Sequence, residues 1–393
     1  MTRRSSLFPF HLSAFAWNFG LSMTYVLLPL FALELGMSGL AIGSLVSLPI
    51  LLQVVLGLLG GAYADRVGAK QISLAACLVA TMAPLIFVAS ASFAGLLAGQ
   101  FLMIVSRAIY WPAVWALTSE LPGDLSRNTG VLIASSNAGQ IAGMVIAGMV
   151  IAPFGFRAGF WIMAAAGLVA FVASMYMAGP SSRRLRAKPA LWATYALLVR
   201  QRTIYFAIAC ACISALPYSL SASFYPILLV EQGFSSDATG WLMALRAAGS
   251  IVAGMLIARF VRRANHEMPP FASAVVSAAC VGLMPLLAHP LWVGLFLLGI
   301  GVGSGVMNVY FQILISVTST AEQRSSAMAL GGVGWGVSNF ATPIIVGALR
   351  DAWGIHTAFY LLGLALLLGS LALPLMQRWS LRGAGQLNHG PAR

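Results

Sequence analysis

Twelve long apolar stretches divide the sequence, and short polar or glycine-containing segments separate them. A helix that crosses a bilayer needs about 20 predominantly apolar residues, and each stretch approaches or exceeds that length. The predicted spans are Phe10–Leu33, Gly39–Ala62, Ile72–Ala91, Phe93–Leu117, Thr129–Ala152, Ala158–Gly179, Thr203–Val230, Ala238–Phe260, Phe271–Ala288, Leu291–Val317, Ser325–Leu349 and His356–Gln377. The sequence therefore predicts an all-α membrane protein with twelve transmembrane helices.

Composition supports a bilayer as the partner of this chain. Hydrophobic residues make up 60% of the sequence and charged residues 8%, whereas soluble domains carry about 25% charged residues. A net charge of +13 in a soluble protein would indicate nucleic acid. Here the basic residues lie in short segments between apolar spans, so we expect no nucleic-acid partner.

The basic residues set the orientation of the predicted helices. All but four of the 22 Lys and Arg residues fall on one side of the membrane if the N-terminus is cytoplasmic. The exceptions are Arg157 and Arg350 on the opposite side, and Arg107 and Arg246 within spans. This bias follows the positive-inside rule and predicts that both termini are cytoplasmic. We expect no cleavable signal, because the first apolar run is too long and lacks a small-residue cleavage site.

The two halves of the sequence match when the chain is shifted against itself by 197 and later 199 residues. The matching pairs are Pro29/Pro226, Glu34/Glu231, Gly36/Gly233, Ser38/Ser235, Gly43/Gly240, Gly57/Gly254, Arg66/Arg263, Arg127/Arg324, Gln140/Asn339, Gly148/Gly347, Gly155/Gly354 and Phe160/Phe359. Six helices per half keep both copies in one orientation, as in transporters that bind substrate between two repeats. We predict a six-helix bundle at 1–179, a basic cytoplasmic linker at 180–202, a second six-helix bundle at 203–379 and a disordered tail at 380–393.

The segment Gly61-Ala62-Tyr63-Ala64-Asp65-Arg66-Val67-Gly68-Ala69-Lys70 follows the second span. It resembles the signature loop of the major facilitator superfamily (MFS), and departs from it at Ala69, where a basic residue is usual. The resemblance implies a multi-pass transporter of the bacterial inner membrane and a cytoplasmic latch. The gating residues would be Gly61, Asp65, Arg66, Gly68 and Lys70. Asp65 would meet the positive N-terminus of a neighbouring helix; the alternative is an ordinary solvated loop.

Charged and polar residues within the spans are the candidate substrate-binding residues. An arginine inside a membrane is costly, so Arg107, followed by Tyr110 and Trp111, indicates a cavity, or else pairing with a backbone carbonyl. The helices with which the family lines its cavity supply further candidates, any of which could instead join helices. The full set is Asn18, Tyr25, Arg107, Tyr110, Trp111, Asn137, Gln140, Tyr218, Arg246, Asn308, Gln312, Trp335 and Asn339.

Energy coupling has few candidates, because all nine acidic residues lie at helix ends or in loops. Glu34, at a helix C-terminus, and His11, near the inner end of the first span, are the candidate titrating groups. An outer-loop charge and a snorkelling imidazole are the plain alternatives. The four cysteines lie in apolar spans without the spacing of a disulfide framework or a metal site. We expect no metal and no cofactor.

The leading functional hypothesis is proton-coupled export of a small amphipathic or anionic compound by a monomer. A family export element is only partly matched at Gly139–Gly148, where Met144 stands in place of proline. The alternative is an importer or uncoupled facilitator of an organic anion. An intramembrane enzyme would need clustered acids, histidines or an activated nucleophile, and the sequence has no such cluster. The absence of a nucleotide-binding loop argues against ATP as the energy source.

Overall fold

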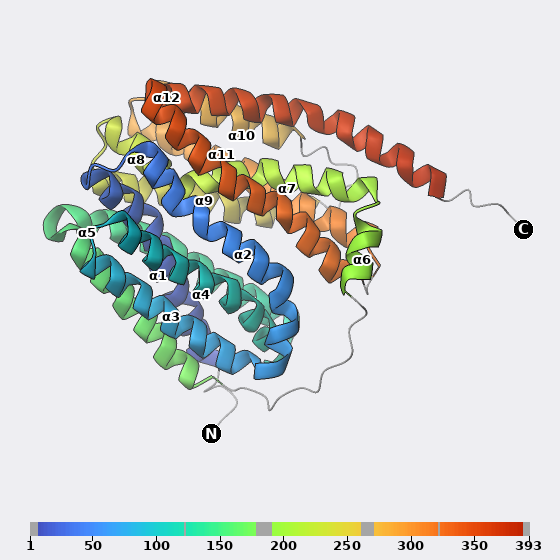
Figure 1. Ribbon diagram of the computed structural model, residues 1–393, viewed down its shortest axis with the longest axis horizontal. Coiled ribbons are helices and arrows are strands. Elements are labelled where there is room, and N and C mark those ends of the chain that lie inside the picture. The colour runs from blue at the N-terminus through green and yellow to red at the C-terminus, as the bar shows by residue number, and fades with distance from the viewer. Residues whose placement is uncertain (1–6, 122, 178–190, 261–270, 321–322, 388–393) are drawn as a thin grey trace, which may run out of the picture. The chain divides into compact units, whose positions relative to one another are not determined.

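The computed structural model describes residues 7–121, 123–177, 191–260, 271–320 and 323–387, and these contain helices and no β-strand (Figure 1). Side chains are not described for 57–67, 120, 191–194, 255–256, 258–260, 324–325 and 381–387. The helices are α1 (Leu7–Glu34), α2 (Gly39–Val67), α3 (Ala69–Ala89), α4 (Phe93–Glu120), α5 (Leu125–Met175), α6 (Leu191–Leu198), α7 (Arg202–Ser221), α8 (Tyr225–Glu231), α9 (Ser236–Phe260), α10 (Phe271–Leu283), the 3₁₀ turn η1 (Met284–Leu286), α11 (Pro290–Thr318) and α12 (Arg324–Leu387).

The described helices confirm the twelve predicted spans. Helices α1 to α4, α9 and α11 each correspond to one span, and α10 with η1 corresponds to the ninth. Helices α5 and α12 each contain two spans, separated by non-helical backbone at Gly155 and Gly354. The seventh span comprises α7 and α8.

The structure differs from the predicted helices in three places. The helix expected over Thr203–Val230 is interrupted at residues 222–224, because Pro226 lacks an N–H group and fits the first turn of a new helix, α8. Pro285 likewise converts the end of the ninth span into the 3₁₀ turn η1. Helix α12 continues to Leu387, so a helix occupies part of the tail that we predicted to be disordered.

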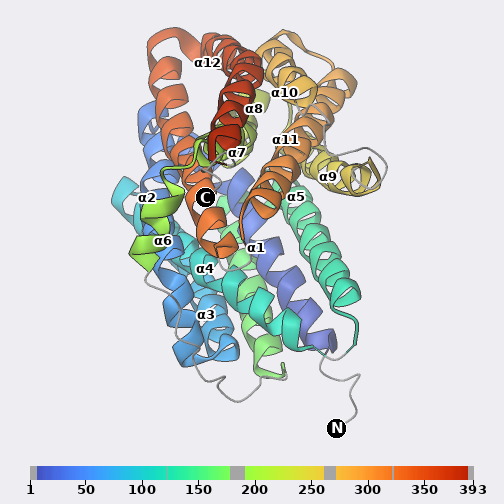
Figure 2. The same cartoon turned by 90° about the vertical axis from the view of Figure 1, so that its right-hand side faces the viewer.

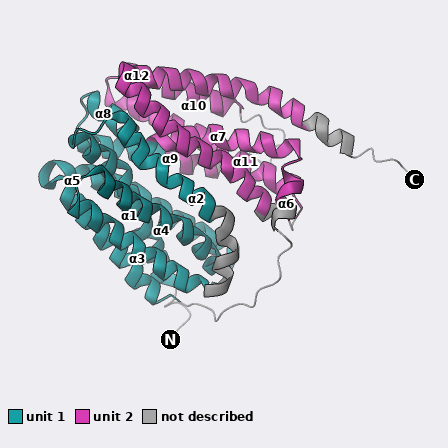
Figure 3. Ribbon diagram, in the orientation of Figure 1, with its two compact units in different colours: residues 1–186, 221–247 teal, residues 187–220, 248–393 magenta. Residues whose placement is uncertain are grey.

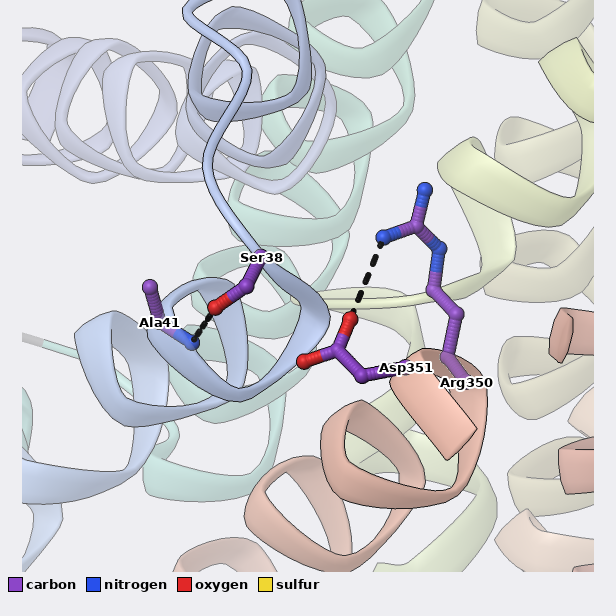
Figure 4. Close-up of polar contacts among 4 residues, drawn as sticks. All are labelled: Ser38, Ala41, Arg350 and Asp351. Carbon is purple, nitrogen blue, oxygen red and sulfur yellow. Dashed lines mark hydrogen bonds and ion pairs between the residues drawn. The ribbon is translucent and has the colours of Figure 1, made fainter. Parts of the chain in front are cut away.

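The internal repeat is visible in the backbone. Gly36 and Gly233 both adopt positive φ, at 72° and 90°, in the turns after α1 and α8. Each turn is followed by a serine that caps the next helix: Ser38 Oγ accepts from Ala41 N at 3.2 Å (Figure 4), and Ser235 Oγ accepts from Ala238 N at 3.4 Å. Gly155 and Gly354, another matched pair, also both adopt positive φ. Residues that match between the halves thus share backbone conformation as well as identity.

The chain divides into two compact units (Figure 3). Unit 1 comprises Met1–Arg186 and Ser221–Ala247, and unit 2 comprises Ala187–Leu220 and Ala248–Arg393. Part of the second sequence half, including α8, thus belongs with the first half, unlike the division drawn from the sequence. Within unit 1, α1 packs on α5, and α3 packs on both α4 and α5 (Figures 1 and 2). Within unit 2, α10 packs on α11 and α12.

Each unit has an apolar core of its own. The core of unit 1 is centred on Trp17 of α1, Cys77 of α3 and Tyr110 of α4. The core of unit 2 is centred on Phe206 of α7 and Phe311 of α11. Lipid tails are as apolar as these side chains, so close backbone approach is what favours helix association in a membrane.

Candidate functional site

An aromatic cluster joins α1 and α4 in unit 1. The rings of Trp17 and Tyr110 stack with centroids 4.1 Å apart and an interplanar angle of 6°. Trp17 Nε1 donates a hydrogen bond to Ser106 Oγ at 3.0 Å, and Ser106 Oγ donates to the carbonyl of Ala76 at 2.8 Å. This chain of hydrogen bonds ties α1 to α4 and α4 to α3. Trp17 is therefore held in one orientation inside the bundle.

Tyr110 was predicted as a substrate-binding residue, and the structure places it in the core. Its side chain is fully buried, between Trp17 and the apolar residues of α3 and α4. Tyr110 thus contributes packing in this conformation rather than an accessible surface. Trp111, the next residue, is only half-buried, and its ring meets Trp17 edge-on with centroids 6.1 Å apart.

Arg107, Trp111 and Trp115 form a strip along α4, which we name the α4 strip. The three residues are spaced four apart, so they lie on one side of the helix. Arg107 and Trp111 are half-buried and Trp115 is 43% exposed. The rings of Trp111 and Trp115 stack with centroids 6.0 Å apart and an interplanar angle of 30°. A guanidinium group and two stacked indoles thus share one partly open side of α4, beside α1.

The polar candidates on α1 and α5 flank a close helix crossing. A Cβ on Gly139 would collide with the carbonyl oxygen of Phe15, so glycine is what permits this approach of α5 to α1. Asn137 and Gln140, on either side of Gly139, are half-buried. Asn18 is buried, and its amide donates to the carbonyl of Ala14 at 2.8 Å.

Two further candidates of unit 1 are buried. Tyr25 of α1 is 5% exposed, and Arg246 of α9 is 1% exposed. An arginine inside a membrane protein is costly. Burial of Arg246 within the protein keeps its charge away from lipid, where the charge would be costly.

Unit 2 contains a second aromatic pair. The rings of Tyr218 on α7 and Trp335 on α12 lie 4.8 Å apart at 46°, and both side chains are half-buried. The Asn339 amide donates to the carbonyl of Trp335 at 2.8 Å, one turn away on α12. On α11, Asn308 is half-buried and Gln312 is exposed. The structure thus brings Tyr218, Trp335 and Asn339 together, with the other two on a separate helix.

The predicted gating loop is only partly described. Gly68 has φ 99° and forms the joint between α2 and α3. Lys70 Nζ donates to the carbonyl of Met175 at 2.9 Å, where a cation stabilises the C-terminal end of α5. The side chains at Gly61, Asp65 and Arg66 lie outside the described residues.

The two candidate coupling residues lie at opposite ends of α1. Glu34 is exposed in the last turn of α1. His11 is half-buried in α1, and its ring contacts Phe10 edge-on with centroids 5.3 Å apart. Among the residues that the structure describes, no group of His, Cys, Asp and Glu side chains could hold a metal ion.

Three residues that shape this region were not among the predicted site residues: Trp17, Ser106 and Trp115. The spacing of Trp115 from Trp111 and Arg107 was readable in the sequence. The hydrogen bond between Trp17 and Ser106 depends on which faces of α1 and α4 meet, and a single sequence carries no signal for that.

Comparison with known proteins adds the family context. A sequence model described as the Major Facilitator Superfamily matches residues 10–318 and 207–385. Quinolone resistance protein NorA of Staphylococcus aureus is 25% identical over 173 residues, and Multidrug resistance protein 2 of Bacillus subtilis is 28% identical over 160 residues. These alignments cover 44% and 40% of this chain, and it spans the same shares of the two relatives, less than half of their length.

Solved structures of transporters have the same fold over almost the whole chain. A bacterial homolog of the human lysosomal transporter Spinster gives a TM-score of 0.77 at 14% identity, covering 99% of both chains. Nucleoside transporter NupG gives 0.79 at 15% identity, covering 96% of this chain and 99% of NupG. The human organic anion transporter MFSD10 gives 0.64 at 16% identity, covering 95% of this chain and all of the other. At these identities the likeness concerns the fold alone.

Proposed function

The chain belongs to the Major Facilitator Superfamily, and on that premise we propose that it exports amphipathic organic anions across the membrane by alternating access. In transporters built from two parallel six-helix repeats, substrate binds near the middle of the membrane, and the two repeats rock around it. The internal repeat of this chain fits that design. We further propose that the protein is a monomer of the bacterial cytoplasmic membrane with both termini cytoplasmic.

The α4 strip is the observation that carries the substrate class. The planar guanidinium of Arg107 matches the geometry of a carboxylate or phosphate and donates two parallel hydrogen bonds to it. The indoles of Trp111 and Trp115 offer apolar faces on the same side of α4. A compound with an anionic group and a planar apolar body would satisfy both parts at once.

The export direction is supported by the curated relatives. NorA and Multidrug resistance protein 2 are named for resistance to quinolones and to multiple drugs, and resistance by a transporter requires removal of the compound from the cell. The glycines of α5 also fit the partial export element of the sequence. Gly139 and Gly143 both lie against backbone atoms of α1, where an added Cβ would collide.

We further propose that export is coupled to protons, with two residues of α1 as the candidate titrating groups. Glu34 and His11 are the candidate coupling residues, but the exposed position of Glu34 suits an ordinary surface carboxylate equally well. Uncoupled transport or import of an organic anion is therefore the second candidate function. The two candidate functions differ in whether a pH gradient alone drives the substrate against its own concentration gradient.

A proteoliposome assay tests both the direction and the substrate class. The purified protein is reconstituted with an inward or outward pH gradient, and flux is measured for aromatic carboxylates, aliphatic carboxylates and aromatic cations. We expect aromatic carboxylates to accumulate against their gradient when protons flow the opposite way. Transport that does not depend on the pH gradient would favour the uncoupled facilitator. Selective transport of cations would contradict the role of Arg107.

Variants at Arg107 test the role of the guanidinium. Loss of a charged hydrogen bond costs about 1.5–3 kcal/mol, so Arg107→Ala should raise the half-saturating concentration about 10- to 100-fold. Arg107→Lys keeps the charge but loses the planar fork, so it separates bidentate binding from a simple field effect. Arg157→Ala, an exposed arginine of unit 1 near Gly155, is the matched control. Wild-type transport by Arg107→Ala at equal abundance would refute the proposed site.

A further inference from the structure

An exposed cluster of arginines and aromatic rings lies where α7 begins and where α12 approaches its end, within unit 2. The Arg202 guanidinium carbon is 5.2 Å from the centroid of the Trp379 ring. The Tyr205 ring meets Trp379 edge-on, with centroids 6.5 Å apart. Arg200 and Arg378 are exposed next to these residues in the sequence. We name Arg200, Arg202, Tyr205, Arg378 and Trp379 the basic–aromatic patch.

The length of α12 places this patch at the level of the lipid headgroups. Trp379 follows the break at Gly354 by 25 residues, and a helix rises 1.5 Å per residue, so the segment is about 37 Å long. The hydrocarbon core of a bilayer is about 30 Å thick. With Gly354 at one edge of the hydrocarbon core, Trp379 lies beyond the opposite edge, among the headgroups. Because Arg202 lies over the Trp379 ring, the start of α7 is at the same depth.

The positive charge of the basic–aromatic patch favours an anionic ligand. The sequence has no Asp or Glu between Asp124 and Glu231, and none after Asp351. Helix α7 and the part of α12 that follows Gly354 therefore bring cations to this end of unit 2 and contain no acidic residue. Arginine binds phosphate through two parallel hydrogen bonds, and stacking on an aromatic face holds its guanidinium plane in place.

The aromatic and apolar side chains favour a lipid over a free ion. Trp379 is 43% exposed and Tyr205 is 44% exposed. Such rings are typical of the membrane interface, where one side meets the acyl chains and the other meets water. The exposed apolar residues Leu197 and Val199 directly precede Arg200. Basic residues that served only to orient the helices in the membrane would not need these exposed apolar side chains beside them.

We propose that the basic–aromatic patch binds the phosphate headgroup of an anionic phospholipid, and that the bound lipid fastens the start of α7 to the end of α12. Arg202 and Arg378 contact the phosphate, while Tyr205 and Trp379 pack against the glycerol and the upper acyl chains. This site depends on insertion in the membrane and not on the transported compound. Its test is therefore independent of the transport assay.

The experiment measures which lipids remain with the purified protein. Wild type is placed in nanodiscs of phosphatidylcholine with increasing phosphatidylglycerol, and retained lipid is counted by native mass spectrometry alongside thermal unfolding. We expect saturable retention of phosphatidylglycerol and a rise in Tm. Each arginine removed should weaken retention about fivefold, which corresponds to the interaction of one cation with an anionic surface. Arg202→Ala, Arg378→Ala and the double variant give this series.

Controls separate a built site from general attraction. Arg157→Ala removes an exposed arginine in unit 1 and should retain lipid like wild type. Trp379→Leu keeps every charge but should lose retention, and Arg202→Lys should lose part of it, so both report on the site even if the double variant fails to fold. Equal retention by wild type and Trp379→Leu, or equal losses with Arg157→Ala, would overturn the proposal. So would the same rise in Tm from inorganic phosphate in nanodiscs of phosphatidylcholine alone.

Discussion

Replacing Gly148 with alanine should destabilise the crossing of α5 and α9 in unit 1. A Cβ built on Gly148 would lie 2.9 Å from the Cα of Gly240 and 3.0 Å from its nitrogen, and would collide with the carbonyl oxygen of Ser236. These neighbours are backbone atoms, which cannot rotate away as a side chain can. Carbon atoms pack at about 3.5–4.0 Å, so the two helices would have to separate by roughly 0.6–1 Å.

The expected cost follows from two opposing effects. Overpacking of a close contact costs about 1–3 kcal/mol. Alanine in a helix is more favourable than glycine by about 0.5–1 kcal/mol, which offsets part of that cost. The midpoints of these two ranges give a net destabilisation of the packed crossing of about 1.2 kcal/mol, which shifts an equilibrium roughly 8-fold. Because α5 and α9 come from opposite sequence halves, the variant should favour conformations in which these helices are apart.

Thermal unfolding and transport rates measure this effect. Gly130→Ala on the same helix is the matched control, since a Cβ there would meet nothing within 4 Å. We expect a lower Tm for Gly148→Ala, and an unchanged or higher Tm for Gly130→Ala. Gly240→Ala should resemble Gly148→Ala, and the double variant should cost less than the sum, because one separation of the helices accommodates both methyl groups. Equal stability of Gly148→Ala and Gly130→Ala would refute the reasoning.

Three further predictions concern packing, topology and gating. Trp17→Phe loses the hydrogen bond to Ser106 and should lower the free energy of unfolding by about 1–2 kcal/mol. Trp161→Phe, at an exposed position of α5, should change it by less than about 0.5 kcal/mol. Equal Tm values for these two variants would contradict the structural role of Trp17. Ser182→Cys should resist an impermeant thiol reagent added outside intact cells, and labelling would reverse the proposed orientation. Asp65→Asn should shift cross-linking towards conformations open to the cytoplasm, while an unchanged pattern with normal transport would count against the latch.

Helix positions were predictable because the bilayer imposes a length and an apolar composition on every span. The repeat also carried over to backbone detail, as the paired turns at Gly36 and Gly233 illustrate. The break within the seventh span was missed, since Pro29 remains inside α1 whereas its counterpart Pro226 begins a new helix. The same residue type in matched positions thus had two outcomes, which local sequence does not distinguish.

The site was harder to predict because it depends on which face of each helix is covered. Arg107 and Trp111 were identified from their residue types, and the structure leaves both half-exposed. Tyr110 was grouped with them by adjacency in sequence, but it points into the core, about 100° around the helix from Trp111. Periodicity could have separated these two residues. Assigning the buried face to either one required knowledge of α1 as a neighbour.

The joints at Gly155 and Gly354 have a mechanical consequence. Each connects two membrane-crossing segments through a single non-helical residue, and one residue spans at most about 3.3–3.6 Å. Such a joint permits a change of angle but almost no sliding of one segment past the other. The two arms of α5 should therefore be able to change their angle at Gly155 but hardly their register, and the same holds for the two arms of α12 at Gly354. A displacement of one arm along its axis would be passed almost in full to the other arm.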